Sequence, residues 1–115
     1  MLDRDEVRQI IKEVLAQTEP AVGLADKWEG GTLVLKPGLS SLQSKEIPIE
    51  TFFHKVVMVR DKLRVLEQKI NAHPKLSDVE KAEMQQYITR CYGSLTTLNV
   101  LFKHEEDKFK GTSTD

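Results

Sequence analysis

The sequence predicts a mainly α-helical domain centred on a long antiparallel helical hairpin, preceded by a short N-terminal helix and a small β-hairpin. Apolar residues recur at alternating steps of four and three over about 48–72 and again over about 77–109, the spacing of helices that pack together. The link between these stretches, HPKL, is short, and a short link lays two helices antiparallel. Because apolar residues cover more than one side of each stretch, a second hairpin is expected to complete a dimeric bundle.

Residues 3–18 are expected to form the N-terminal helix. Asp3 can cap it, because a side-chain oxygen there accepts a free backbone N–H of the first turn, and Pro20 ends it. A helix of this length is marginal alone. It is therefore expected to dock on the main hairpin, or else on another protein or a second copy. The residues of its apolar stripe are Val7, Ile10, Ile11, Val14 and Leu15.

A β-hairpin is predicted over about 26–36. Gly30-Gly31 would supply the positive φ angles of a two-residue turn, placing Trp28 opposite Leu33, with Leu35 on the same face. Two strands alone are rarely stable, so the ribbon is expected to lie on the helices or to pair with the ribbon of another copy. Trp28, Leu33 and Leu35 are predicted interaction residues; the simpler alternative for Trp28 is a structural anchor.

Both long helices have clear starts. Pro48 suits the first turn of the earlier helix, and Ser77 with Glu80 forms a capping box at the start of the later one. Their apolar rows are expected to face each other. These rows are Phe52, Val56, Val59, Leu63, Leu66 and Ile70 in the first helix and Met84, Ile88, Cys91, Leu95, Leu98 and Phe102 in the second. The domain is expected to span 1–110, with 111–115 as a disordered tail.

A row of small residues marks a further surface for contact. Thr89, Gly93 and Thr97 recur at steps of four in the second helix. Glycine inside a helix costs about 1 kcal/mol relative to alanine, so this row is expected to face a close neighbour: the N-terminal helix or the ribbon, a second copy, or a small molecule. The aromatic interaction residues expected at the end of the hairpin away from the turn, where something must cover them, are Phe52, Phe53 and Phe102.

Basic residues along the hairpin offer contacts for an anion or an acidic partner. Lys55, Lys62 and Lys69 are seven apart and share one stripe of the first long helix. The commonest role of such a stripe is a solvated flank whose lysine stems cover apolar surface. The alternative function is a ligand-binding or enzymatic helical bundle, and the arginines that would hold its anionic small molecule are Arg60, Arg64 and Arg90.

The sequence contains no constellation for catalysis or cofactor binding. Cys91 has no histidine within a turn to act as its base, and Gly-rich phosphate loops, Gly-x-Ser-x-Gly and Cys-x-x-Cys motifs are missing. Glu50, His54, His104 and Glu105 could cluster, but the Glu-x-x-His pairs of di-metal bundles are absent. No catalytic residue, cofactor or metal is therefore predicted.

Composition and net charge argue against several classes of protein. The net charge is −1 and the pI about 6.3, whereas nucleic-acid binders usually carry a basic excess. The single cysteine excludes an intrachain disulfide framework, the charged start is no signal peptide, and no apolar run approaches the length of a membrane span. The sequence predicts a cytoplasmic dimer with a protein partner and with no membrane or nucleic acid. The predicted function is that of a non-catalytic scaffold, adaptor or regulatory protein acting by protein–protein interaction through its self-associating hairpin.

Overall fold

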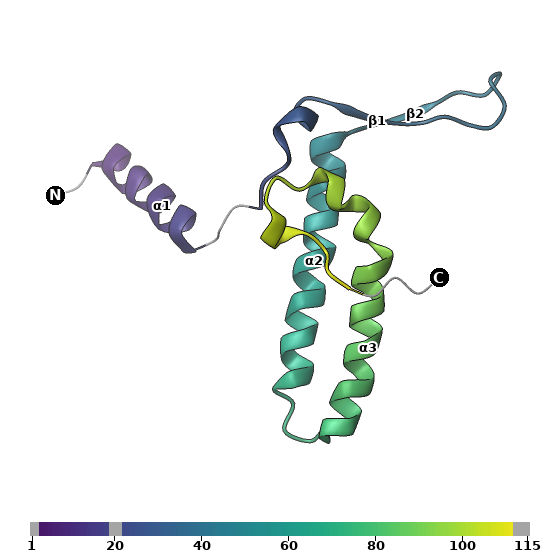
Figure 1. Ribbon diagram of the computed structural model, residues 1–115. Helices are drawn as coiled ribbons and strands as arrows, with labels where there is room; N and C mark the ends of the chain where they lie inside the picture. Colours follow the sequence, from purple (N-terminus) through teal and green to yellow (C-terminus); the bar gives the residue numbers. More distant parts are fainter. Residues whose placement is uncertain (1–2, 19–21, 112–115) are drawn as a thin grey trace.

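The computed structural model describes residues 3–18 and 22–111 and is mainly helical (Figure 1). Two long helices, α2 (Ile49–Asn71) and α3 (Asp78–Ser94), contact each other as the predicted hairpin. A two-stranded antiparallel sheet precedes them, and short 3-10 helices follow α3. The capping box of α3 is confirmed: the Glu80 N–H donates to the Ser77 hydroxyl at 3.1 Å, and the Ser77 N–H donates to the Glu80 carboxylate at 3.0 Å.

The N-terminal helix, α1 (Arg4–Thr18), forms where predicted. The Asp3 carboxylate caps it by accepting the Glu6 N–H at 2.7 Å. The helix points away from the hairpin (Figure 1). Among the side chains described on α1, Val7, Ile10 and Ile11 are exposed, so the expected docking on the chain's own hairpin is not observed.

The β-hairpin lies further along the chain than predicted. β1 (Thr32–Leu35) pairs with β2 (Lys45–Pro48), and Leu33 lies opposite Ile47. The expected pairing of Trp28 with Leu33 is wrong, because Asp26–Trp28 form a 3-10 helix whose last carbonyl accepts the Gly31 N–H at 3.0 Å. Gly30 does have a positive φ of 72°, but it ends this short helix instead of joining two strands.

The contact between α2 and α3 is rotated by part of a turn relative to the predicted one. Val56 and Ile88 are buried as expected. Polar groups also lie along the contact: the Gln85 amide donates to the Glu67 carbonyl at 3.3 Å and to the Asn71 side chain at 2.8 Å. As a result, two of the six residues in each predicted apolar row lie outside the hairpin. The members left outside are Val59 (49% exposed), Leu66 (48%), Met84 (41%) and Cys91.

Helix α3 ends at Ser94, well before the predicted end near residue 109. The Ser94 and Thr96 hydroxyls donate to carbonyls of the last turn, that of Thr96 to Gly93 at 2.8 Å. Such side chains compete for the backbone groups that would continue a helix. The chain goes on as a 3-10 helix, Thr96–Leu101, so Thr97 does not extend the predicted row of small residues.

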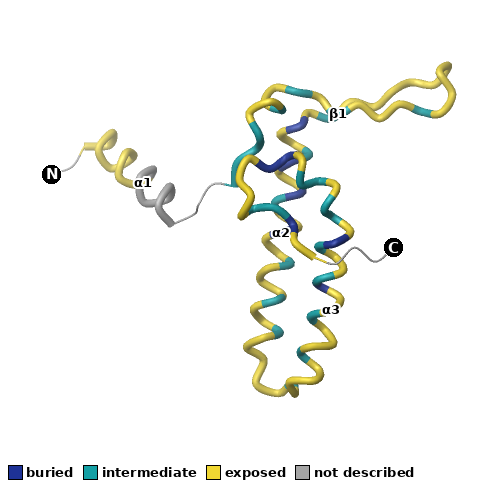
Figure 2. Tube along the Cα trace, viewed as in Figure 1, coloured by how far each residue is buried: buried dark blue, intermediate teal, exposed yellow. Residues whose placement is uncertain are grey.

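The core lies at the end of the hairpin away from the turn, where Figure 2 shows most of the buried positions. Phe53 meets Phe102 edge to face at 5.3 Å between ring centres, and Phe102 meets Phe109 at 5.6 Å. Trp28 packs beside them, and its ring N–H donates to the Val100 carbonyl at 2.8 Å. The buried residues of this cluster are Ile49, Phe53, Val56, Leu101, Phe102 and Phe109.

The stretch after α1 joins the core through the C-terminal part of the chain. The Ala25 N–H donates to the Leu101 carbonyl at 2.8 Å, and the Lys103 N–H donates to the Gly23 carbonyl at 2.9 Å. The Lys103 ammonium also pairs with the Asp26 carboxylate at 3.2 Å. Residues 22–26 and 101–103 therefore lie side by side.

Candidate functional site

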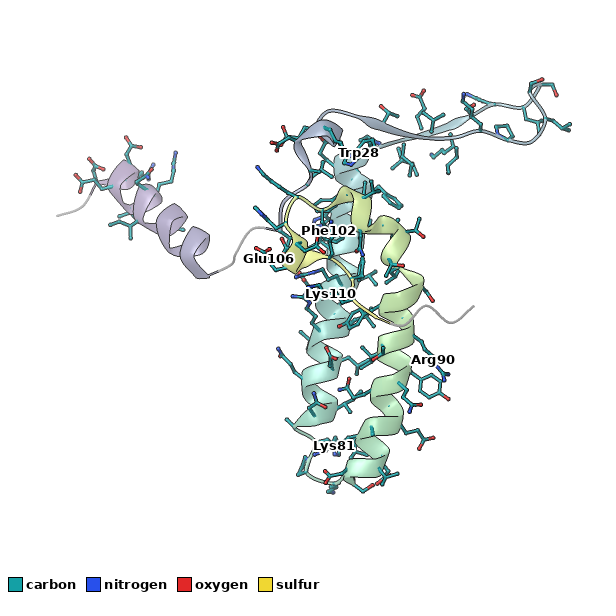
Figure 3. The ribbon with its side chains drawn as sticks, viewed as in Figure 1. Trp28, Lys81, Arg90, Phe102, Glu106 and Lys110 are labelled. Carbon is teal, nitrogen blue, oxygen red and sulfur yellow. The ribbon has the colours of Figure 1, made fainter. Side chains whose placement is uncertain are left out.

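Residues 102–111, here called the C-terminal segment, fold back across the hairpin (Figures 1 and 3). Two hydrogen bonds fix the segment to the preceding 3-10 helix: the Phe109 N–H donates to the Asn99 side chain at 2.7 Å, and the Asn99 amide donates to the Phe109 carbonyl at 2.9 Å. The segment contains a further 3-10 turn, Glu105–Asp107. The segment covers the aromatic core on one face of the hairpin. A cover was expected there from the sequence, but the residues that supply it were not identified.

Arg60 of α2 holds this segment in place. It is only 5% exposed, and its Nε–H donates to the Asp107 carbonyl at 2.8 Å. The guanidinium also pairs with the Asp61 and Asp107 carboxylates, the latter at 3.5 Å. A buried charge is costly unless it is paired and hydrogen-bonded, and these partners meet that requirement. Arg60 is thus engaged within its own chain.

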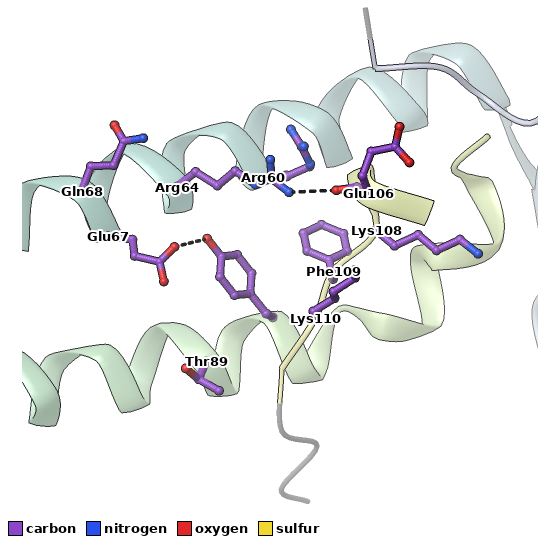
Figure 4. Close-up of a pocket in the computed structure, with 10 residues that line it drawn as sticks. Arg60, Arg64, Glu67, Gln68, Thr89, Glu106, Lys108, Phe109 and Lys110 are labelled. Atoms are coloured by element: carbon purple, nitrogen blue, oxygen red, sulfur yellow. Dashed lines mark hydrogen bonds between the residues drawn. The ribbon is translucent and has the colours of Figure 1, made fainter. Parts of the chain in front are cut away.

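Beside Arg60 the segment closes over a cavity of about 400 Å³ (Figure 4). Arg64 reaches toward it from α2, and its guanidinium makes one long hydrogen bond of 3.5 Å to the Glu106 carbonyl. Across the cavity the Tyr92 hydroxyl donates to the Glu67 carboxylate at 3.3 Å. Burial raises the pKa of the Tyr92 phenol, and the neighbouring Glu67 adds to the rise. The lining residues are Arg60, Arg64, Glu67, Gln68, Thr89, Tyr92, Glu106, Lys108, Phe109 and Lys110.

The cavity does not gather the three arginines of the predicted anion site. Arg90 is exposed on α3, and its guanidinium lies 5.8 Å from the centre of the Tyr87 ring (Figure 3). The guanidinium of Arg60 is paired with two aspartates and donates a hydrogen bond to a backbone carbonyl. The carboxylates of Glu67 and Glu106 at the rim would repel an anion. The arrangement therefore serves packing of the C-terminal segment better than capture of a ligand.

The close neighbour expected at Thr89 and Gly93 is this same segment. Gly93 is buried. A Cβ on Gly111 would run into the Thr89 carbonyl and come within 2.7 Å of the Gly93 nitrogen and 2.9 Å of the Tyr92 Cβ. The close approach therefore needs glycine at position 111 of the segment. Of the predicted tail 111–115, Gly111 contacts α3, and 112–115 lie outside the described residues.

The opposite side of the hairpin carries the exposed apolar residues. Arg60 and Arg64 of α2 reach the C-terminal segment. At 100° per residue, Val59 and Leu66 lie on the other side of the buried Val56, turned away from that segment.

The same relation holds on α3. Thr89 and Gly93 meet the C-terminal segment, whereas Met84 and Cys91 lie beyond the buried Ile88 on the other side. Because antiparallel helices bring corresponding sides together, the exposed residues of the two helices share one surface. This surface, Val59, Leu66, Met84 and Cys91, is called the open face below. Its flank on α2 is formed by the exposed Lys55, Lys62 and Lys69.

The other predicted interaction residues divide between core and surface. Phe53, Gly93 and Phe102 are buried within the chain, where they pack against other parts of the same chain. Phe52 and Leu33 are partly buried against the core. Leu35 is 52% exposed on the projecting β-hairpin, and the loop between the strands exposes Leu39 and Leu42.

The described part of the chain offers little else for chemistry. Over residues 3–18 and 22–111 no three His, Cys, Asp or Glu side chains gather as metal ligands. The Glu50 carboxylate instead accepts the Gly30 N–H at 2.6 Å, which lowers its pKa. Within the same residues, no helix combines the length and apolar character needed to cross a membrane.

Comparison with known proteins places the chain in a family. A family model described as Domain of unknown function (DUF8685) matches residues 18–108. The match takes in the β-hairpin, both long helices and most of the C-terminal segment, and it begins where α1 ends. No curated protein and no solved structure matches the chain. The chain belongs to the DUF8685 family.

Proposed function

We propose that this protein is a non-catalytic scaffold or adaptor that acts by protein–protein interaction and associates with itself through the open face. The observation that carries the proposal is the exposure of two of the six residues in each predicted apolar row. Val59, Leu66 and Met84 are between 41% and 49% exposed. Their spacing is that of helices which bury an apolar row against a partner.

The distribution of apolar surface supports self-association as well. The C-terminal segment covers one face of the hairpin, and the open face has no corresponding cover among the described residues. Contiguous apolar surface on a small domain commonly marks an interaction site. Helices of a second copy packed against the open face would bury these residues in a helical bundle. The exposed free thiol of Cys91 on this face fits a reducing compartment such as the cytoplasm.

The anion-binding alternative has weaker support. Its arginines are not brought together, and the cavity beneath the C-terminal segment mixes four cationic side chains with two carboxylates. The paired state of Arg60 leaves little capacity for a ligand. Protein–protein contact is therefore the function that the geometry supports best.

Substitutions on the open face test the proposal. Leu66→Glu and Met84→Glu should each weaken the dimer, raising its dissociation constant roughly tenfold or more. Both side chains are more than 40% exposed, so the monomer should keep its fold. The matched control is Val79→Glu, since Val79 is 76% exposed and lies on another side of α3. If wild type and both variants sediment as the same species, the open face is not the contact.

A further inference from the structure

We infer that the open face binds helix α1 of a second copy of this chain, with α1 running antiparallel to α2. The inference rests on the proposed self-association and names the element that fills the face. Both surfaces are apolar and exposed. The residues are Val7, Ile10 and Ile11 on α1, and Val59, Leu66, Met84 and Cys91 on the hairpin. Isolated helices of this length are marginally stable in water, so such a contact would stabilise α1.

The charges beside the two apolar surfaces are complementary. Lys55, Lys62 and Lys69 are exposed along the α2 flank of the open face, and within the described chain no carboxylate pairs with them. On α1, Glu6 lies along one edge of the apolar stripe, and the sequence repeats a glutamate seven residues later at Glu13. The spacing of the two glutamates equals that of the lysines.

The opposite edges also match. The exposed Arg4 and Arg8 lie along the other edge of the α1 stripe. The far flank of the open face, on α3, carries exposed Glu80 and Glu83 near the turn of the hairpin. α1 therefore has an acidic and a basic edge, and the open face has a basic and an acidic flank.

This pattern sets the direction of α1. When two helices pack antiparallel, the residues anticlockwise of the contact on one helix lie beside the anticlockwise residues of the other, each helix being viewed from its own N-terminus. When they pack parallel, the anticlockwise residues of one lie beside the clockwise residues of the other. We place the residues at 100° per residue and view each helix from its own N-terminus. Glu6 then lies anticlockwise of the centre of the α1 stripe. Lys62 likewise lies anticlockwise of the residues that α2 contributes to the open face. Glu6 of α1 thus meets the lysines only when α1 is antiparallel to α2. In that direction Arg4 lies at the turn end of the hairpin, beside Glu80 and Glu83.

The length of the connecting chain favours the α1 of a second copy over the chain's own. Hydrogen bonds between residues 23–25 and residues 101–103 hold this part of the chain beside the start of the C-terminal segment, which covers the other face of the hairpin. From Thr18 to Val22 there are four Cα–Cα steps, which reach at most about 14 Å. A helix packed on the open face has its axis about 8–10 Å from those of the hairpin. The path also has to round α2, which is itself about 10 Å thick. The link is too short for that path.

A pair of charge-reversal variants of the full chain tests the inference. One variant carries Glu6→Lys and Glu13→Lys, and the other carries Lys55→Glu, Lys62→Glu and Lys69→Glu. Alone, each places like charges in the contact and should raise the dimer dissociation constant roughly tenfold at low ionic strength. Mixed in equal amounts, they should form a heterodimer with wild-type affinity, because every α1 then meets a flank of opposite charge. Unchanged circular dichroism verifies that each variant is folded.

The outcomes separate this inference from the proposed function. Heterodimer formation from two weakened variants supports exchange of α1 between copies. If wild type and both variants are equally stable dimers, the role of α1 is refuted while self-association stands. If each variant is weakened and mixing restores nothing, α1 docks within its own chain or elsewhere, and the exchange is refuted. If wild type is a monomer, the proposed self-association itself fails.

Discussion

Replacement of Phe109 by alanine is the sharpest test of the C-terminal segment. Phe109 is 4% exposed, 5.6 Å from the Phe102 ring centre and 6.2 Å from that of Tyr92. Phe→Ala at a buried position costs about 3–5 kcal/mol through lost burial and the cavity left behind. Phe109 lies outside any helix or strand, where the backbone can partly relax into a cavity, so we expect a loss near the lower value, about 3 kcal/mol, in the free energy of unfolding.

Urea denaturation of the full chain, followed by circular dichroism, measures this loss. Phe109→Leu preserves most of the apolar volume and should cost less than about 1.5 kcal/mol. Val100→Ala is the matched surface control, since Val100 is 53% exposed and such changes usually stay within about 0.5 kcal/mol. If Phe109→Ala behaved like Val100→Ala, the segment would not be packed on the hairpin, and α3 would be free to continue as the sequence alone predicts.

Three further predictions concern the backbone and the caps. Gly111→Ala should destabilise the chain by about 1–3 kcal/mol, because its Cβ would strike the backbone of Thr89 and Gly93, whereas Gly38→Ala meets nothing within 4 Å and should be neutral; thermal melting compares the two. Ser77→Ala should cost about 1 kcal/mol by removing the cap of α3, and Ser77→Thr should retain most of that stability. Hydrogen bonds lower the pKa of Glu50 and Glu80 below the usual 4.5. Their contribution is therefore complete above pH 4.5 and is lost as the pH falls through the lowered pKa values. Glu50→Gln should flatten the acid limb of the stability profile, and an unchanged limb would contradict this assignment.

The long helices were predictable because their signals are local and repeated. The capping box at Ser77 and Glu80 fixed the start of α3, and the apolar spacing after Pro48 fixed α2. The same spacing left the orientation open, since the apolar residues of α2 cover more than half of its circumference. In the structure, Arg60 of α2 faces inward and binds the C-terminal segment.

The missed features depend on contacts that are distant in sequence. Gly30-Gly31 resembles a hairpin turn, but the strand that pairs with β1 lies beyond a nine-residue loop. The reason for a glycine at position 31 is different: a Cβ there would come within 2.8 Å of the Ile49 side chain. The C-terminal segment is highly charged, and Phe109 is its one apolar anchor after Phe102. Its position on Thr89 and Gly93 was signalled only by the glycine within the helix.

Sedimentation equilibrium of the full chain at micromolar concentration measures self-association through the open face. The chain has a mass of 13.1 kDa. We expect a species of twice that mass, reduced to a single chain's mass by Leu66→Glu but not by Val79→Glu. A wild-type protein that sediments as one chain across that concentration range would contradict this expectation.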